Sequence, residues 1–162
     1  MAPNEPAPAG RTLLRKAKAA AKDAEPLTRV FLASRARTMP YLPKLHSDAD
    51  TLAWMTYVVL PGTAVWVAET GTGDVLGFAS VDGTELEHLY LRPDVRRRGI
   101  GSLLLAKARE ISPEELTLHV FQRNTDARAF YERHGFTPVD FNDGSRNEEK
   151  EPDVLYRWMA RG

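Results

Sequence analysis

The chain has 162 residues, 43% of them apolar, which suits one globular domain with its own core and argues against a second folded domain. Lysine plus arginine and aspartate plus glutamate number 22 each, so no overall field would attract nucleic acid or an anionic membrane. There is no cysteine, which excludes disulfides, thiolate metal sites and a cysteine nucleophile.

The N-terminal end differs in composition from the rest of the chain. Residues 1–10 contain three prolines and a glycine, and we expect a disordered leader there, followed by a single domain over residues 11–162. The leader lacks the apolar segment of a signal peptide, and nowhere do 18 apolar residues run together. We therefore expect a soluble, cytoplasmic protein. The basic residues 11–18 fit either an edge strand or the start of a helix.

Two helices are expected next. Apolar residues recur at helical spacing from Leu27, with Asp23 as a candidate cap and Pro26 near the first turn, and this helix should end before Pro40. A second helix begins at Ser47, which forms a capping box with the acid three residues later, and ends at Pro61-Gly62.

Three strands should then form an antiparallel meander. Apolar and β-branched residues alternate over 64–69 and 75–81, and a third strand covers 84–92. The first turn, Gly71-Thr72-Gly73-Asp74, and the second, Asp82-Gly83, have the composition of hairpin connections.

The second half of the chain alternates helices and strands. We expect, in order, a helix over 100–111, a strand over 116–121, a helix over 125–134 with Gly135 at its cap, a strand over 136–139, an irregular loop over 141–152 and a strand over 153–159. Strands 84–92 and 116–121 should be parallel, because a helix connects them in a right-handed crossover. The expected fold class is α/β with α+β character, in which helices flank a mixed, mostly antiparallel central sheet.

The turn before helix 100–111 is basic and rich in glycine. Its glycines let the backbone approach a ligand closely, and the N–H groups that open the helix point outward beside a partial positive charge. A P-loop pattern is absent from the chain. We interpret the turn as a phosphate site rather than a solvated charged loop, formed by Arg96, Arg97, Arg98, Gly99, Ile100, Gly101 and Ser102.

These residues carry a family resemblance. Arg96-x-x-Gly99-x-Gly101, after a strand that ends in Leu89-Tyr90-Leu91-Arg92-Pro93, resembles the pyrophosphate-binding motif of the Gcn5-related N-acetyltransferases, the GNAT family. Asn124, followed by Tyr131 and Gly135-Phe136, resembles the other half of that family's cofactor site. Together the matches cover roughly residues 64 to 140. The resemblance implies the GNAT fold, acetyl-CoA as cosubstrate, and an amine of a small molecule or peptide as acceptor.

The resemblance also implies individual roles. The strand end Leu89, Tyr90 and Leu91 would line the pantetheine arm, with backbone groups of Leu89 and Leu91 pairing with it as if it were another strand. Asn124 would bind the pantetheine amide, although it also suits a helix cap. Tyr131 would donate to the departing CoA thiolate, although it could instead fill a gap between helix and sheet.

Three residues are candidates for the base that the acceptor needs, because an amine with a pKa of roughly 10 is mostly ammonium at neutral pH. Strict alternation places Glu85 and Glu87 on the same side of their strand as Leu89 and Leu91, opposite Leu86, His88 and Tyr90. By resemblance, Glu85 falls where histone-type relatives place their base, and His119 falls where protein N-terminal acetyltransferases carry a basic carboxylate. Solvent-facing or core positions are the alternatives, and the sequence does not choose among the three.

Metal sites and partners can also be judged. The four histidines show no metal-ligand spacing, so we expect no metal site. We expect no nucleic-acid or membrane partner and leave a homodimer open.

The loop 140–153 carries six acids, which would favour a cationic amine if it walls the acceptor site, while a solvated loop is an equal alternative. The other wall would contain Arg35, Arg37, Met39, Tyr41 and His46. A catalytically silent module that senses acyl-CoA is the alternative function.

Overall fold

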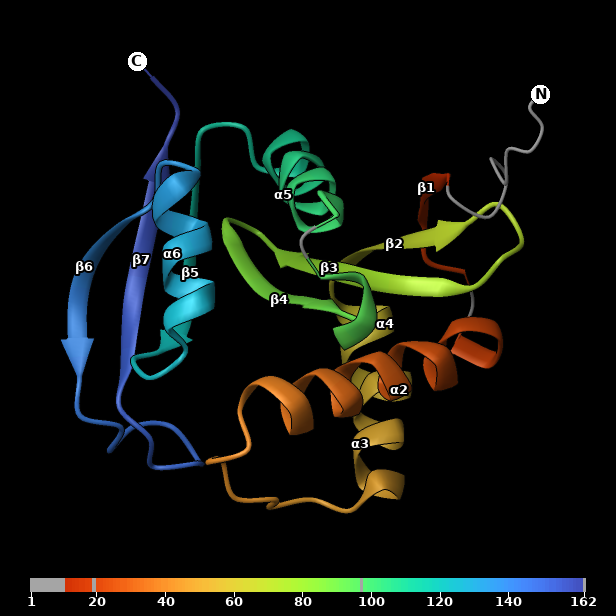
Figure 1. The fold of residues 1–162 in the computed structure, drawn as a ribbon, viewed down its shortest axis with the longest axis horizontal. Helices are drawn as coiled ribbons and strands as arrows, with labels where there is room; N and C mark the ends of the chain where they lie inside the picture. Colours follow the sequence, from red (N-terminus) through yellow and green to blue (C-terminus); the bar gives the residue numbers. More distant parts are fainter. Residues whose placement is uncertain (1–10, 19, 97, 162) are drawn as a thin grey trace.

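The structure, a computed structural model, describes residues 11–18, 20–96 and 98–161. The expected leader over 1–10 and the candidate site residue Arg97 lie outside the described residues. A seven-stranded sheet has the order β1-β2-β3-β4-β5-β7-β6 (Figure 1). Its strands are β1 (Thr12–Lys16), β2 (Ala64–Thr70), β3 (Val75–Asp82), β4 (Glu85–Leu91), β5 (Glu115–Phe121), β6 (Thr137–Asn142) and β7 (Asp153–Met159). Only β4 and β5 pair in parallel among these strands, so the mixed, mostly antiparallel sheet is confirmed.

Helices cover both faces of the sheet. In the view of Figure 1, α5 lies above strands β3 and β4, α2 and α3 lie below them, and α6 lies in front of β5. A π-helical turn, η2, continues α3, and a 3-10 turn, η3, precedes α5. The bounds are α2 (Ala20–Thr38), α3 (Asp48–Trp54), η2 (Met55–Val59), α4 (Leu60–Gly62), η3 (Pro93–Val95), α5 (Ile100–Ile111) and α6 (Thr125–Arg133).

Two apolar cores result from this arrangement. The α5-side core joins α5, α6 and the sheet, and includes Leu86, Leu104, Leu118, Tyr131 and Tyr156. The α2-side core joins α2, η2 and the opposite face of β2 and β3, and includes Leu27, Met55, Val67 and Phe78. The sheet is therefore packed on both faces, which fixes the position of β4 between the two helical layers.

The N-terminal segment and α2 depart from the expectation. Residues 12–16 form the edge strand β1, and α2 begins at Ala20, so Pro26 lies inside the helix rather than near its start. Asp23 is not a cap: its carboxylate is 1% exposed and binds the Arg15 guanidinium of β1 at 2.9 Å. This contact joins β1 to α2, and the helical spacing of apolar residues within α2 does not reveal it. The start of α2 was therefore misplaced in the prediction.

Strand β4 contains a bulge. Ser80 of β3 pairs with His88, but the next residue, Val81, pairs with Leu86, so Glu87 is an extra residue in β4. The expected strict alternation is therefore wrong at this point. Leu86 belongs to the α5-side core, whereas His88 packs against aromatic rings on the α2 side. A bulge shifts the direction of every side chain beyond it, and the residue pattern alone does not reveal it.

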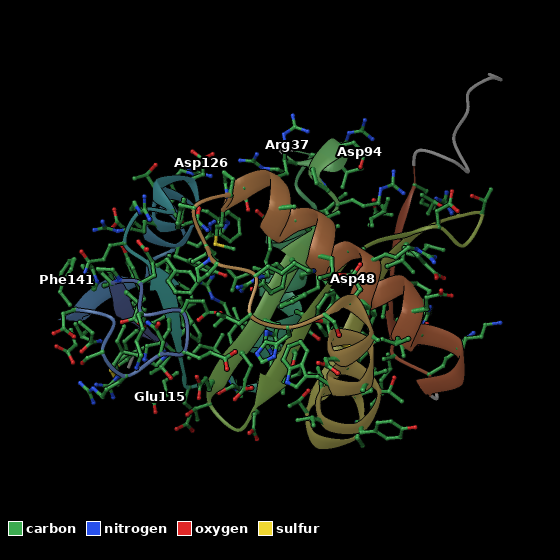
Figure 2. All side chains as sticks on the ribbon, turned by 90° about the horizontal axis from the view of Figure 1, so that it is seen from below. Arg37, Asp48, Asp94, Glu115, Asp126 and Phe141 are labelled. Carbon is green, nitrogen blue, oxygen red and sulfur yellow. The ribbon has the colours of Figure 1, made fainter. Side chains whose placement is uncertain are left out.

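Strand β6 is longer than expected. Its outer residues Phe141 and Asn142 pair with Val154 and Asp153 of β7, so the irregular loop begins at Asp143 rather than at Phe141. Figure 2 shows Phe141 at one edge of the molecule. Within the described ranges, no helix combines the length and apolar character that crossing a membrane requires.

Candidate active site

The two parallel strands separate almost as soon as they meet. Glu85 and Thr117 form the one register pair between β4 and β5 in the described chain, supported by the Thr117 N–H, which donates to the Thr84 carbonyl at 2.9 Å. Beyond this point, among the residues that the structure describes, β4 has a backbone partner only in β3. One edge of β4 therefore stays open over its second half, which is the form of a strand ready to accept another extended chain.

The backbone direction along β4 identifies the groups at the open edge. The Arg92 N–H donates to the Leu76 carbonyl of β3 at 2.8 Å. Because backbone groups in an antiparallel pair alternate between facing the partner and facing away, Tyr90 also faces β3, and Leu89 and Leu91 direct their N–H and carbonyl groups away from it. These are the two residues that the resemblance assigns to an extended ligand.

The basic turn leads from this open edge into α5. Gly99 has a φ of 80° and caps the helix without any side-chain hydrogen bond, which leaves the N–H groups of the first turn available. The Arg96 guanidinium binds Asp126 of α6 at 2.7 Å, so the turn is tied to the next helix; Asp126 is labelled in Figure 2. Ile100 is buried and Arg98 is exposed. A positive, uncapped helix end therefore lies next to the open strand edge.

Helices α5 and α6 meet closely at this end. A Cβ atom at Gly101 would lie 3.3 Å from two carbons of the Phe130 ring, so a larger residue would push the helices apart. The Ser102 hydroxyl lies 3.0 Å from His134 Nε2, and His134 Nδ1 lies 2.8 Å from the Phe130 carbonyl. The Nδ1 atom must therefore donate to that carbonyl, which leaves Nε2 of a neutral ring to accept from Ser102.

Asn124 and Tyr131 come from α6. The Asn124 side-chain oxygen accepts from the Ala127 N–H at 3.2 Å, so the capping role is present, while the amide NH₂ has no hydrogen-bond partner among the described residues. Tyr131 is 8% exposed and packs edge-on against Phe130 and Phe136, at centroid distances of 5.1 and 5.4 Å. Burial, followed by the nearby Tyr90, raises the pKa of the Tyr131 phenol, which therefore stays protonated.

The three candidate bases gather near the closed end of the split. Glu85 Oε2 lies 3.8 Å from His119 Nδ1, which brings two of them together across the parallel pair. The third, Glu87, occupies the bulge. Partial burial, then the carboxylates of Glu85 and Asp82, raise the pKa of Glu87, which makes it a stronger base than an ordinary glutamate.

Comparisons with known proteins agree with this geometry. Residues 61–138 match the family model described as an acetyltransferase (GNAT) domain. The chain is 39% identical over 77 residues to the peptidyl-lysine N-acetyltransferase YjaB of Salmonella typhimurium, covering 48% of this chain and 52% of that protein. The solution structure of apo-form YjaB from Escherichia coli superposes with a TM-score of 0.76 at 23% identity, covering 93% of this chain and 99% of that one. The chain therefore has the fold of the GNAT acetyltransferases, and its segment 61–138 matches their family model.

Two further proteins are similar to this chain in sequence or in structure. YiaC of Escherichia coli, also named a peptidyl-lysine N-acetyltransferase, is 35% identical over 94 residues, covering 57% of this chain and 62% of that protein. The PaiA N-acetyltransferase of Thermoplasma acidophilum, solved in complex with coenzyme A, has a TM-score of 0.70 at 23% identity, with 92% and 99% coverage. In sequence, the chain spans about half the length of the first curated relatives that it matches.

A large cavity lies mostly outside the segment that matches the family model, with His88 and Tyr90 as the exceptions. It measures about 720 Å³ and lies between α2, the connection to α3, β4 and the loop before β7. Arg35, Met39 and His46 line it as expected, but Arg37 and Tyr41 do not. The Tyr41 ring lies instead under the Arg123 guanidinium, 4.0 Å away.

The acidic loop does not form the negative wall that its composition suggests. Glu149 binds Arg35 at 3.0 Å and Glu148 lies 2.8 Å from His46 Nε2, so both acids of this loop that line the cavity pair with the opposite wall. Glu151 binds Arg123 at 2.8 Å. Arginines within the protein therefore compensate the charges of Glu149 and Glu151.

Sequence reasoning missed the aromatic floor of the cavity. Phe31, Trp54, His88 and Tyr90 form it, with Phe31–Trp54 and Trp54–His88 ring centroids 5.2 and 5.1 Å apart. Tyr90 was expected to line the cofactor, yet its side chain faces this cavity. Tyr90 alternates with Leu89 and Leu91 along the strand and therefore points to the opposite face from them, and a stripe of aromatic residues on α2, α3 and β4 was the available signal.

We expect His88 to remain neutral throughout the physiological pH range. Burial, then the positive charge of Arg35, lower its pKa to about 4. The unfolded chain takes up this proton at a pH near 6.5, so the resulting stabilisation is complete above that pH and is lost as the pH falls toward 4. An imidazole NMR titration should show no midpoint for His88 between pH 5.5 and 8. A midpoint near 6.5 would contradict the buried position.

Proposed function

We propose that this protein is an N-acetyltransferase that transfers an acetyl group directly from acetyl-CoA to a primary amine of a small molecule or peptide. The observation that carries the proposal is the open edge of β4, which leads to the uncapped N-terminus of α5 at one end and to the candidate bases at the other. Along β4, the described residues would thus provide a site for an anion, an open strand edge for an extended arm and groups that transfer protons.

The residues present fit coenzyme A. N–H groups at the start of α5 would bind the diphosphate, with Arg96 and Arg98 adding positive charge, because helix N-termini stabilise anions. Backbone groups of Leu89 and Leu91 would pair with the amide groups of the pantetheine arm. The free NH₂ of Asn124 would donate to the same arm. When bound, acetyl-CoA supplies an activated thioester.

Residues of the chain would then transfer the protons of the acceptor amine. An acceptor ammonium loses one proton to Glu87 or to the Glu85–His119 pair, directly or through water, and the neutral nitrogen forms a bond to the acetyl carbon. The carbon–sulfur bond breaks, the second amine proton is released, and the thiolate receives a hydrogen bond from Tyr131. One proton ends on the CoA thiol and one in solvent. A backbone N–H near Leu89 would stabilise negative charge on the acetyl oxygen.

A free-thiol assay tests this function. The protein and acetyl-CoA should release CoA thiol when a panel of polyamines, amino acids, aminoglycosides and N-terminal peptides is added, and mass spectrometry should find one amine acetylated. Binding of acetyl-CoA without turnover of any amine would instead favour the silent sensing module. Absence of both binding and turnover would exclude both functions.

A further inference from the structure

The cavity described above is larger than a lysine side chain needs and has a defined chemical character. We propose that it selects an amino-acid-like acceptor, an amine that carries a carboxylate beside an apolar or aromatic body, with Arg35 binding the carboxylate. The inference rests on the proposed function, since it names the substrate class for the same site. Apart from His88 and Tyr90, the residues that line this cavity lie outside the 61–138 segment shared with the family model.

The floor of the cavity suits an apolar or aromatic body. Phe31 meets Tyr90 edge-on at a centroid distance of 4.9 Å, and His88 meets Trp54 edge-on at 5.1 Å, so their faces and edges form a continuous surface. Met39, which is 5% exposed, adds an adaptable apolar wall. Burial of a phenyl-sized group against such a surface stabilises a complex by roughly 1.5–3 kcal/mol.

Arg35 supplies the polar contact within this apolar surface. Its guanidinium carbon lies 5.2 Å from the centre of the Phe31 ring, and its charge lowers the pKa of His88, which places it at the cavity floor. An arginine has five N–H donors, and one of them is bound to Glu149 in the described structure. The remaining donors can bind a planar carboxylate in the fork geometry that guanidinium favours.

The charge distribution argues against a polycation and against a phosphate. Glu148 and Glu149 are paired with His46 and Arg35, and Asp50 is the one other acid of the cavity lining, so at most one carboxylate remains to bind the further ammonium groups of a polyamine. Arg35 already shares its charge with Glu149, which suits a singly charged carboxylate better than a dianionic phosphate. A ligand with one carboxylate and one amine therefore matches the cavity better than a polyamine or a phosphate does.

Three amines with the same aromatic body test the proposal: phenylalanine, phenylalanine amide and phenethylamine. Thiol release from acetyl-CoA is measured for the wild type, Arg35→Gln and the control Arg37→Gln. Arg37 is on the same helix but is exposed and does not line the cavity (Figure 2). Comparing proteins on one amine cancels differences in amine basicity.

Arg35→Gln should lower kcat/KM for phenylalanine about tenfold or more and change that for phenethylamine less than about twofold, since hydrogen bonds to charged groups contribute roughly 1.5–3 kcal/mol. Arg37→Gln should match the wild type on all three. Glu149→Gln, which frees Arg35 but keeps its charge, should increase the preference for phenylalanine, and thermal melting shows whether each variant folds.

The outcomes separate the two proposals. Faster turnover of spermidine or of a lysine peptide than of phenylalanine, unaffected by Arg35→Gln, would overturn this inference and leave the acetyltransferase function standing. If no amine is turned over, the proposed function fails, and calorimetry with phenylalanine in the presence of CoA decides the inference separately. Binding that Arg35→Gln abolishes would support it, and no binding would overturn it.

Discussion

Replacing Tyr131 with phenylalanine is expected to lower kcat about ten- to hundredfold without weakening CoA binding. Since its pKa is raised, the phenol is a poor source of a full proton for a thiolate, whose ordinary pKa is about 8.5. A hydrogen bond to a charged group contributes roughly 1.5–3 kcal/mol, and the loss of that amount from the transition state gives the expected decrease.

The same substitution should leave the fold intact. The Tyr131 ring packs between Phe130 and Phe136 in the α5-side core, and phenylalanine retains those contacts. Tyr57→Phe is a matched control, because Tyr57 is 77% exposed and loses the same hydroxyl. We expect single-turnover thiol release to slow only in Tyr131→Phe, at equal CoA affinity by calorimetry. An unchanged rate would remove Tyr131 from the reaction.

Replacing Gly99 with alanine should weaken CoA binding about tenfold. The φ of 80° at Gly99 lies in the left-handed region, which costs an alanine roughly 1–2 kcal/mol, while a Cβ there would meet no other atom within 4 Å. The expected cause is therefore a change in backbone direction at the start of α5, which moves the N–H groups away from the diphosphate. A change of 1.4 kcal/mol corresponds to about tenfold in affinity.

Gly73→Ala provides the control for this effect. Gly73 also has a positive φ, 93°, and open space around it, but it lies in the turn between β2 and β3. Both variants should lose similar stability by thermal melting, and only Gly99→Ala should lose CoA affinity. Equal affinities in the two variants would show that the α5 turn does not contact the ligand.

The proposed cofactor site rests on signals that are local in the sequence. Gly99 and Gly101, a strand before them and a helix after them are contiguous in sequence, and the structure places them together. The crossover rule then brings β5 beside β4. Tyr131 and Asn124 follow from the spacing within a single helix.

The cavity proposed to bind the acceptor could not be predicted, because contacts between distant parts of the chain form it. The bulge at Glu87 reverses the expected direction of Leu86, and the Arg15–Asp23 ion pair moves the start of α2. The cavity combines α2 with Glu148 and Glu149, more than a hundred positions away in the chain, and these contacts compensate the loop's charges. Composition alone therefore suggested a negative wall where the structure has paired charges.

The central claim is that the N–H groups at the start of α5 bind the diphosphate of coenzyme A. Calorimetric titration of the wild-type protein with CoA and with pantetheine, which lacks the diphosphate and nucleotide, tests it most directly. Two charge-assisted hydrogen bonds contribute about 3 kcal/mol or more, so CoA should bind at least about a hundredfold more tightly than pantetheine. Equal affinities for the two ligands, or no heat with CoA, would contradict the claim.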